Sequence, residues 1–430
     1  MNDMIEILSH LQKYVPNART LEELDNVDVR DDTSAEMRQI PVGGDQLTCE
    51  RIRGAHMARF DGDTPEERLE GLFCMVEDFH EKMNFLQLLM DKYFKPESCR
   101  EQGTLYQLKN LVNRRNVSKN VSSNYHAASE FIDLVTDCHV IAACLEYCGM
   151  GNLESQCKKI PTALHLADST VKRRVLRHLV GEIVDTFFLN AITINVDRIE
   201  DPASDMDVAP IAQDDAVYNY ATNFTKLGLL RKVAVNATRY GDGNRMLRHW
   251  KYAMLVYHQG HKIKYRLESF LLLAGVNALL TPRQKHQVIH NRFINLRGGE
   301  GHNLDGDYVM ELLNRYAKSR IKLLGPNHNE TCVERIGKTM MFCHEIQDKL
   351  EQQISVAPLS RKHTPQSLHH DRNTIIQQLK NSCVFQLIPG RSHQTFSMEN
   401  VDIFSNVDVQ EVHKWLNQKK REYSFGKNAF

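Results

Sequence analysis

Apolar residues recur at helical spacing over most of this chain, and this periodicity limits its fold more than any other feature. The stretches HAASEFIDLVTDCHVIAACLEYC and TVKRRVLRHLVGEIVDTFF, residues 126–148 and 170–188, both carry an apolar stripe, and residues 217–239 and 245–280 continue the pattern. The segment DTPEERLEGLFCMVEDFHEKMNFLQLLMDKYF predicts one further long helix across residues 64–94, because Thr64 and Glu67 match a capping box at its start. The sequence therefore predicts a predominantly helical protein.

A short strand near the start is the exception. The apolar segment MRQIPV ends at Gly43, Gly44 and Asp45. Glycines allow a sharp turn or a close approach to a ligand. Asp45 has two interpretations: it holds a metal ion, or it caps the helix that begins with LTCERIRGAHMARF, since Asp is a preferred N-cap residue. With this strand the predicted fold class is mixed α/β, predominantly helical, with a small sheet near Asp45.

The balance of charges limits the partners of the chain. Lys plus Arg and Asp plus Glu both number 54, so the formal net charge is +0. This balance excludes a protein whose whole surface binds polyanions, but it allows a local basic groove. Residues 245–266 combine basic and aromatic side chains, a pattern of nucleic-acid binding in which cations meet phosphates and rings stack on bases. An amphipathic helix with a solvated basic face has the same pattern. The basic residues are Arg245, Arg248, Lys251, Lys262, Lys264 and Arg266, and the rings are Trp250, Tyr252, Tyr257 and Tyr265.

Cysteine spacing and hydropathy indicate the compartment. The ten cysteines include no CxxC pair, and the closest set lacks the spacing of a zinc site. Buried, reduced thiols of an intracellular protein are expected instead. The acidic, amphipathic N-terminus does not resemble a signal peptide, and the longest strongly apolar run, FLLLAGVNALL, is too short to span a bilayer. We therefore expect a soluble, intracellular protein with no membrane partner. The closest cysteine set is Cys138, Cys144, Cys148 and Cys157, with His139.

A second candidate segment lies late in the chain. NLRGGEGHNLDGDYVMELLNRYAK, residues 295–318, has a glycine-rich loop but neither the GxGxxG nor the Walker spacing of a phosphate-binding site. Glu311 lies on the helix expected from about residue 306 to 324. Its neighbour at i+4 is Arg315, and a surface ion pair there is worth about 0.3–0.5 kcal/mol. Spacing alone favours that ion pair for Glu311.

Several stretches in this order resemble a known family. They are GGDQLTCERIRGA, TPEERLEGLFCMVEDFHEKM, GTLYQLKNLVNRRNV, RYGDGNRMLRHWKYAMLVYHQGHKIKYRLE, NRFINLRGGEGHNLDGDYVMELLNRYAK and IPGRSHQTF. Over roughly residues 1–420 the chain resembles the eukaryotic family catalogued as domain of unknown function 6589, which looks like a set of transposon-borne proteins. By analogy with other cut-and-paste transposases, the resemblance implies a partial RNase H-like core with a large helical insertion.

The resemblance also implies a site. RNase H-like nucleases hold two divalent metal ions between carboxylates from separate elements, and Mg²⁺ (or Mn²⁺) prefers such oxygen ligands. Asp45 and Glu311 are then metal ligands, with Glu311 the last acid of a DDE set. The order of helix and strand favours Asp45 as the second acid, with the first acid on a strand upstream of Met1 and the chain truncated. In the alternative, Asp45 is the first acid and Asp78 the second, although Asp78 would lie inside the long helix.

The resemblance implies a transposase-related DNA-processing protein that acts on double-stranded DNA in the nucleus. With the first acid missing, the expectation is a truncated and inactive one. The alternative is a domesticated, non-catalytic DNA-binding or scaffold protein. The expected organisation is an α/β core at residues 1–60, a helical insertion at 61–290 with an acidic loop at 196–216, a returning helix at 291–353, and a linker and tail at 354–430.

Overall fold

Helices make up most of this protein. The computed structural model describes residues 2–16, 39–157, 159–160, 162–189, 215–327, 329–339, 368–396, 404 and 407–424. Of the described residues, 68% are helical and 4% lie in strands, which confirms the predominantly helical class. No described helix is both long enough and apolar enough to cross a bilayer.

The strand predicted before Asp45 is present and belongs to a parallel pair. Strand β1 (Ile40–Gly44) pairs with β2 (Leu72–Val76) from Ile40 opposite Leu72 to Gly44 opposite Val76. Helix α3 (Gln46–Ala58) makes the crossover between them. Parallel strands need such a connection, because the chain has to return to the same end of the sheet.

The single helix predicted across residues 64–94 is wrong. Thr64 Oγ1 does accept from the Glu67 N–H, as in a capping box, and Glu67 Oε2 accepts from the Asp63 N–H. However, they close a turn, and the chain reaches a left-handed conformation at Leu69 (φ 59°) before β2 begins. Helix α4 (Phe79–Tyr93) starts only after the strand. A continuous apolar run such as LFCMV also fits a strand buried on both faces, and periodicity does not distinguish the two.

The two faces of the sheet pack against different helices, because side chains alternate along a strand. Leu72 packs with Leu8 of α1 (Asn2–Leu11) and Ile52 of α3. Phe73 belongs to a second cluster, which includes the buried Trp250 of α9 (Gly243–Gln259). Helix α11 (Pro282–His290) closes that cluster with Val288 and Ile289.

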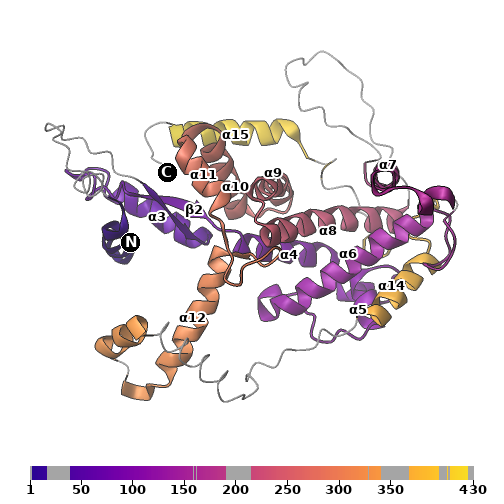
Figure 1. Cartoon of the computed structure of the whole chain (residues 1–430), viewed down its shortest axis with the longest axis horizontal. Helices are drawn as coiled ribbons and strands as arrows, with labels where there is room; N and C mark the ends of the chain where they lie inside the picture. Colours follow the sequence, from indigo (N-terminus) through magenta and orange to yellow (C-terminus); the bar gives the residue numbers. More distant parts are fainter. Residues whose placement is uncertain are drawn as a thin grey trace, which may run out of the picture.

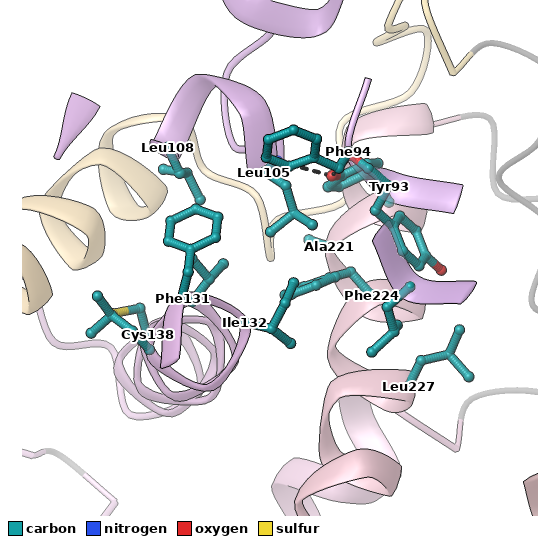
Figure 2. Close-up of a cluster of buried hydrophobic side chains, with 14 of the residues drawn as sticks. Tyr93, Phe94, Leu105, Leu108, Phe131, Ile132, Cys138, Ala221, Phe224 and Leu227 are labelled. Carbon is teal, nitrogen blue, oxygen red and sulfur yellow. Dashed lines mark hydrogen bonds between the residues drawn. The ribbon is translucent and has the colours of Figure 1, made fainter. Parts of the chain in front are cut away.

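The largest core lies between the long helices. Figure 1 shows α4, α6 (Tyr125–Tyr147), α8 (Ala216–Tyr240) and α14 (His369–Asn381) on the side of the molecule away from the N-terminus. In Figure 2, Phe131 of α6 points toward Leu108 of α5 (Leu105–Leu111), and Ile132 lies between α6 and Phe224 of α8. This helical body holds one end of α4 in place, and the other end of α4 meets the sheet.

The later part of the chain returns to the sheet. Helix α10 (Ile263–Ala274) runs into a π-helical turn (Gly275–Leu279), which is followed by α11. Two short antiparallel strands come next, β3 (Phe293–Ile294) and β4 (Leu304–Asp305), of two residues each. Helix α12 (Gly306–Lys322) contacts α4 and β1, and it extends away from the sheet in Figure 1. Helix α15 (Val409–Ser424) packs on α10, where Trp415 meets Phe270. Helix α7 (Ser169–Phe187) follows α6.

Some expected boundaries differ from this arrangement. Strand β2 lies inside the range 61–290 that was expected to be helical, so the α/β part continues past residue 60. Helix α14 lies in the range 354–430 expected to be linker and tail, yet it packs on α6. Most of the acidic loop expected at 196–216 lies outside the described residues, apart from Asp215 and Ala216 at the start of α8. The structure does not confirm an RNase H-like core.

Candidate functional site

Acidic side chains gather where β1 and β2 end. The carboxyl ends of parallel strands meet at one edge of a sheet, which is a common place for ligands in α/β proteins. Asp45 follows β1, Glu77 and Asp78 follow β2, and α12 brings Asp307 and Glu311 to the same edge. We call Asp45, Glu77, Asp307, Glu311 and His80 of α4 the acidic cluster.

Asp45 caps helix α3. Its Oδ1 accepts the Thr48 N–H at 2.8 Å, and its backbone is extended (φ −70°, ψ 176°), as at an ordinary N-cap. The capping interpretation of Asp45 is therefore confirmed. A carboxylate has two oxygens with several lone pairs, so this single bond does not exclude a second contact.

Asp307 joins α12 to the start of α4. Its Oδ1 accepts the Phe79 N–H, and its Oδ2 accepts the His80 N–H, each at 3.0 Å. The His80 ring places Nδ1 2.9 Å from the same Oδ2. A carboxylate at a helix N-terminus satisfies free N–H groups and interacts favourably with the helix dipole. Asp307 thus fixes the position of α12, and of Glu311 one turn further along it.

His80 is the point at which the cluster meets. The hydrogen bond with Asp307 raises the pKa of His80, and the charges of Asp307, Asp45 and Glu311 raise it further, against the opposing effect of burial. Glu311 Oε1 lies 3.9 Å from His80 Nε2, and the Glu311 side chain is 48% exposed. Asp45 and Glu311 are far apart in the sequence, but the fold brings both within electrostatic reach of the His80 imidazole. It assigns Glu311 to His80, where spacing had suggested Arg315.

Glu77 is the least expected member of the cluster. The residue is 6% exposed, and its Oε2 is buried without a hydrogen-bond partner. Burial raises the pKa of Glu77 well above its usual value, and the nearby Asp78, Asp307 and Asp305 add to the rise against the attraction of Arg292. Gly43 makes room for it, because a Cβ at that position would lie 2.1 Å from Glu77 Oε1.

Asp78, the alternative second acid, is occupied by structural contacts. It follows β2 directly, so the expectation that it lies inside a helix is wrong. Arg292 donates to both oxygens, at 2.5 Å from Nη2 and 2.8 Å from Nε, and Trp250 Nε1 donates at 2.7 Å. All three side chains are fully buried. A carboxylate neutralised in this way has little capacity left for a metal ion.

Asp305, which precedes α12, is neutralised in a similar way. Lys82 Nζ lies 2.6 Å from its Oδ2, and Thr238 Oγ1 donates to its Oδ1 at 2.8 Å. This buried pair connects α4 and α8 to β4 and supports the segment on which Asp307 lies.

The described residues do not fit a pair of divalent metal ions. No three His, Cys, Asp or Glu side chains among them are arranged to hold even one ion. Asp78 and Asp305 are each paired with a buried cation, and both oxygens of Asp307 bond to α4. Asp45 and Glu311 remain with capacity for a ligand, whereas burial raises the pKa of Glu77 and disfavours its ionised form. Two readily ionised carboxylates are fewer than the set that a two-metal site needs.

The aromatic residues of the 245–266 stretch are mainly part of the core. Trp250 and Tyr257 are fully buried, where Trp250 bonds to Asp78 and Tyr257 Oη donates to Glu81 Oε1 at 2.6 Å. These two rings are therefore not available to stack on bases, which corrects that part of the prediction. Tyr252 is 50% exposed.

The six basic residues of this stretch divide into two groups. Arg248 and Lys251 are exposed on α9. The other four bond within the protein: Lys262 to Asp91 (3.2 Å), Lys264 to Glu50 (3.0 Å), Arg245 to Asn236 (2.6 Å), and Arg266 to His258 (2.6 Å) with its guanidinium over the Trp415 ring. Arg248 and Lys251 are thus the members best placed to meet an external anion.

Sequence reasoning missed Glu77, His80 and Asp307. Glu77 follows the apolar run LFCMV at the strand exit, as Asp45 follows IPVGG, but the helical pattern of the neighbouring residues extends over this run. Asp307 follows the glycine-rich loop and caps α4, which lies 228 residues earlier. Sequence spacing carries no signal for that contact.

The chain matches a known protein family. A family model described as a family of unknown function (DUF6589) matches residues 12–363. No curated protein and no solved structure matches the chain.

Proposed function

This chain belongs to the family of unknown function DUF6589, and we propose that it is a transposase-related DNA-processing protein with an RNase H-like, DDE-type site that its described residues leave incomplete. One observation carries the proposal. Asp45 at the end of a parallel strand and Glu311 on a late helix, far apart in sequence, both act on His80 at the same edge of the sheet. Such convergence of carboxylates from separate elements is what an RNase H-like site requires.

The residues present can bind and position, but they do not complete a metal centre. His80, held by Asp307, offers a positive charge beside Asp45 and Glu311 when it is protonated. Exposed Arg248 and Lys251 offer cations to a phosphate backbone. We therefore propose that the chain binds double-stranded DNA, without base specificity from these contacts and without cleaving it unaided. A nuclear location is part of the same proposal.

DNA binding is tested by its salt dependence. Each lysine or arginine that neutralises a phosphate adds about 0.9 to the slope of the logarithm of affinity against the logarithm of salt concentration. We expect the double variant Arg248→Ala/Lys251→Ala to lower that slope by up to about 1.8 on a random duplex. Lys262→Ala/Lys264→Ala removes the same charge from residues already paired with Asp91 and Glu50, and serves as the matched control. Equal effects of the two variants, or a flat salt response, would contradict the assignment.

Cleavage is tested separately. We expect no Mg²⁺- or Mn²⁺-dependent nicking of supercoiled DNA by this chain, because the described carboxylates do not hold a metal pair. If the chain nicks DNA and Asp45→Asn or Glu311→Gln abolishes the nicking, the site is complete. Asp45 is then the first acid, and the second acid lies elsewhere in the chain.

The second candidate is a non-catalytic DNA-binding or scaffold protein. The buried pairing of Asp78 with Arg292 favours it, since that carboxylate is used for the fold. Binding of Mn²⁺, followed by electron paramagnetic resonance, separates the two functions. Weak binding that Asp45→Asn removes, and that the exposed control Asp63→Asn does not, supports a remnant DDE-type site. Absence of any Asp45-dependent binding supports the scaffold.

A further inference from the structure

Two cysteines meet at the end of helix α6, away from the acidic cluster. Cys148 is the C-cap of α6, and the following loop returns Cys157 to it, close enough for the two thiols to interact. Cys148 is buried, and Cys157 is partly exposed. Two thiols in contact, one accessible and one protected, are the arrangement of an attacking and a resolving cysteine.

The surroundings of Cys157 favour its thiolate. Burial alone raises the pKa of Cys157, but hydrogen bonds from the Cys148 thiol and from the backbone N–H groups of Lys159 and Ile160, with the Lys159 charge, lower it overall. The Lys159 ammonium is held over the Tyr147 ring, 3.3 Å from its centroid. Burial and the contact with Cys157 raise the pKa of Cys148 to about 11, so the proton of the pair stays on Cys148.

Cys157 also faces a hollow in the surface. The hollow has a volume of about 380 Å³ and lies between the loop and the first turns of α7. Leu164 and Leu176 form apolar parts of its wall, and His165 and Lys172 add basic groups. This space admits a small anionic molecule to the sulfur of Cys157.

We propose that Cys157 and Cys148 form a reactive thiol pair that exchanges with anionic low-molecular-weight disulfides. The Cys157 thiolate attacks one sulfur of the disulfide, whose S–S bond breaks and releases one thiolate, and a mixed disulfide forms on Cys157. Cys148 then gives up its proton, attacks the Cys157 sulfur and expels the second thiolate. The two cysteines are oxidised to one disulfide, and the small disulfide is reduced to two thiols.

Oxidised glutathione is the probe. The full chain is treated at pH 7, remaining thiols are alkylated at intervals, and digested peptides are identified by mass spectrometry. Exposed Cys99 is the internal comparison. The thiolate is the attacking species, and thiolate fraction rises faster than nucleophilicity falls when the pKa of a thiol is lowered. We expect Cys157 to react faster than Cys99 and to end as a Cys148–Cys157 disulfide. A slower reaction than that of Cys99, or pairing of Cys157 with Cys144, overturns the proposal.

Variants separate the two roles. In Cys148→Ser the glutathione adduct should persist on Cys157, and in Cys157→Ser neither adduct nor disulfide should form at Cys148. Loss of the adduct in Cys148→Ser would contradict the proposal that Cys157 attacks first. If that variant is poorly folded, the disulfide measurement on the wild-type chain still tests the pair. Lys172→Gln should slow the reaction with oxidised glutathione but not with cystamine, a cationic disulfide. Equal slowing with both probes overturns the preference for anions.

Discussion

Glu77 makes the stability of the fold depend on pH, because its buried carboxyl group resists ionisation. The unfolded chain ionises this carboxyl group at its ordinary pKa, whereas the folded chain raises that pKa by burying the group among other carboxylates. The folded state therefore binds the proton more tightly. This favourable contribution to folding is complete below the unfolded pKa of about 4.3 and is lost as the pH rises through the folded pKa.

We expect Glu77→Gln to stabilise the protein at pH 7, because a neutral amide replaces a carboxyl group that resists ionisation in this place. The free energy of unfolding, measured with urea, should rise by about 1–3 kcal/mol, the range for relieving a buried unsatisfied polar group. It should also lose part of its dependence on pH above about 4.3. Glu97→Gln, at an exposed position, is the control and should have little effect. A less stable Glu77→Gln at pH 7 would mean that the ionised carboxylate has a partner.

His139 gives the opposite dependence on pH. It is fully buried between rings of Phe224 and Phe385, its Nδ1 bonds to the Val135 carbonyl at 2.8 Å, and its Nε2 has no partner. Burial lowers the pKa of His139 to about 4. The unfolded chain thus takes up a proton first as the pH falls.

We expect His139 to reduce stability on acidification, by about 3 kcal/mol between pH 6.5 and pH 4. The contribution of the neutral His139 ring to stability is fully present above the unfolded pKa of about 6.5. It is lost as the pH falls through the folded pKa of about 4. His139→Phe keeps a ring among its aromatic neighbours and should remove this component from an acid unfolding series. An unchanged acid limb in His139→Phe would show that other groups cause the loss.

At the scale of elements, a buried ion pair joins the junction of β2 and α4 to the segment after α11. Asp78 and Arg292 are both fully buried, and Arg292 Nη2 also donates to the Val76 carbonyl at 2.9 Å. Removing one partner leaves an uncompensated buried charge, whereas removing both does not.

We therefore expect Arg292→Met to lower the free energy of unfolding by about 3–5 kcal/mol, and Asp78→Asn by a similar amount. The double variant should lose less than the sum, which thermal or urea unfolding of all four proteins measures. Lys338→Met, which breaks the exposed i,i+4 pair with Glu334, should cost no more than about 0.5 kcal/mol. Additive losses in the double variant would mean that the two side chains are not coupled.

The sequence predicts elements well where local signals are sufficient. The stripe in residues 126–148 corresponds to α6, and the strand before Asp45 is β1. The sequence-based prediction is wrong at β2. A buried parallel strand shows no alternation of apolar and polar residues, and the neighbouring helical pattern extends over it. The candidate site divides in the same way. The family resemblance points to Asp45 and Glu311 as site residues, but Glu77, His80 and Asp307 depend on packing between distant segments.

At the scale of the whole molecule, the helical core extends beyond the family match. The match ends at residue 363, and α14 begins at His369. Arg114 pairs with Asp371 of α14, and Lys380 pairs with Glu146 of α6. The buried apolar side chains from this later segment are Ile375, Ile376, Leu379, Val384, Phe385 and Phe396.

We expect a chain that ends after residue 363 to lose cooperative unfolding. Each of those six side chains contributes about 1.5–3 kcal/mol when buried, and their sum is similar to the whole stability of a typical domain, about 5–15 kcal/mol. A chain that ends after residue 406 loses α15 but keeps α14, and it should still unfold cooperatively in calorimetry. Retained cooperativity in the shorter chain would show that α14 is dispensable.

The fit of Glu77 against two glycines links three distant positions in evolution. A side chain at position 43 would collide with the Glu77 carboxyl group, and one at position 306 would crowd both of its oxygens at 3.1 Å. Relatives that keep a glutamate at position 77 should therefore keep glycine at both places. Relatives with a small residue at 77 are free to vary them. The three positions should change together down the family tree, as a single inherited unit spread over more than half of the chain.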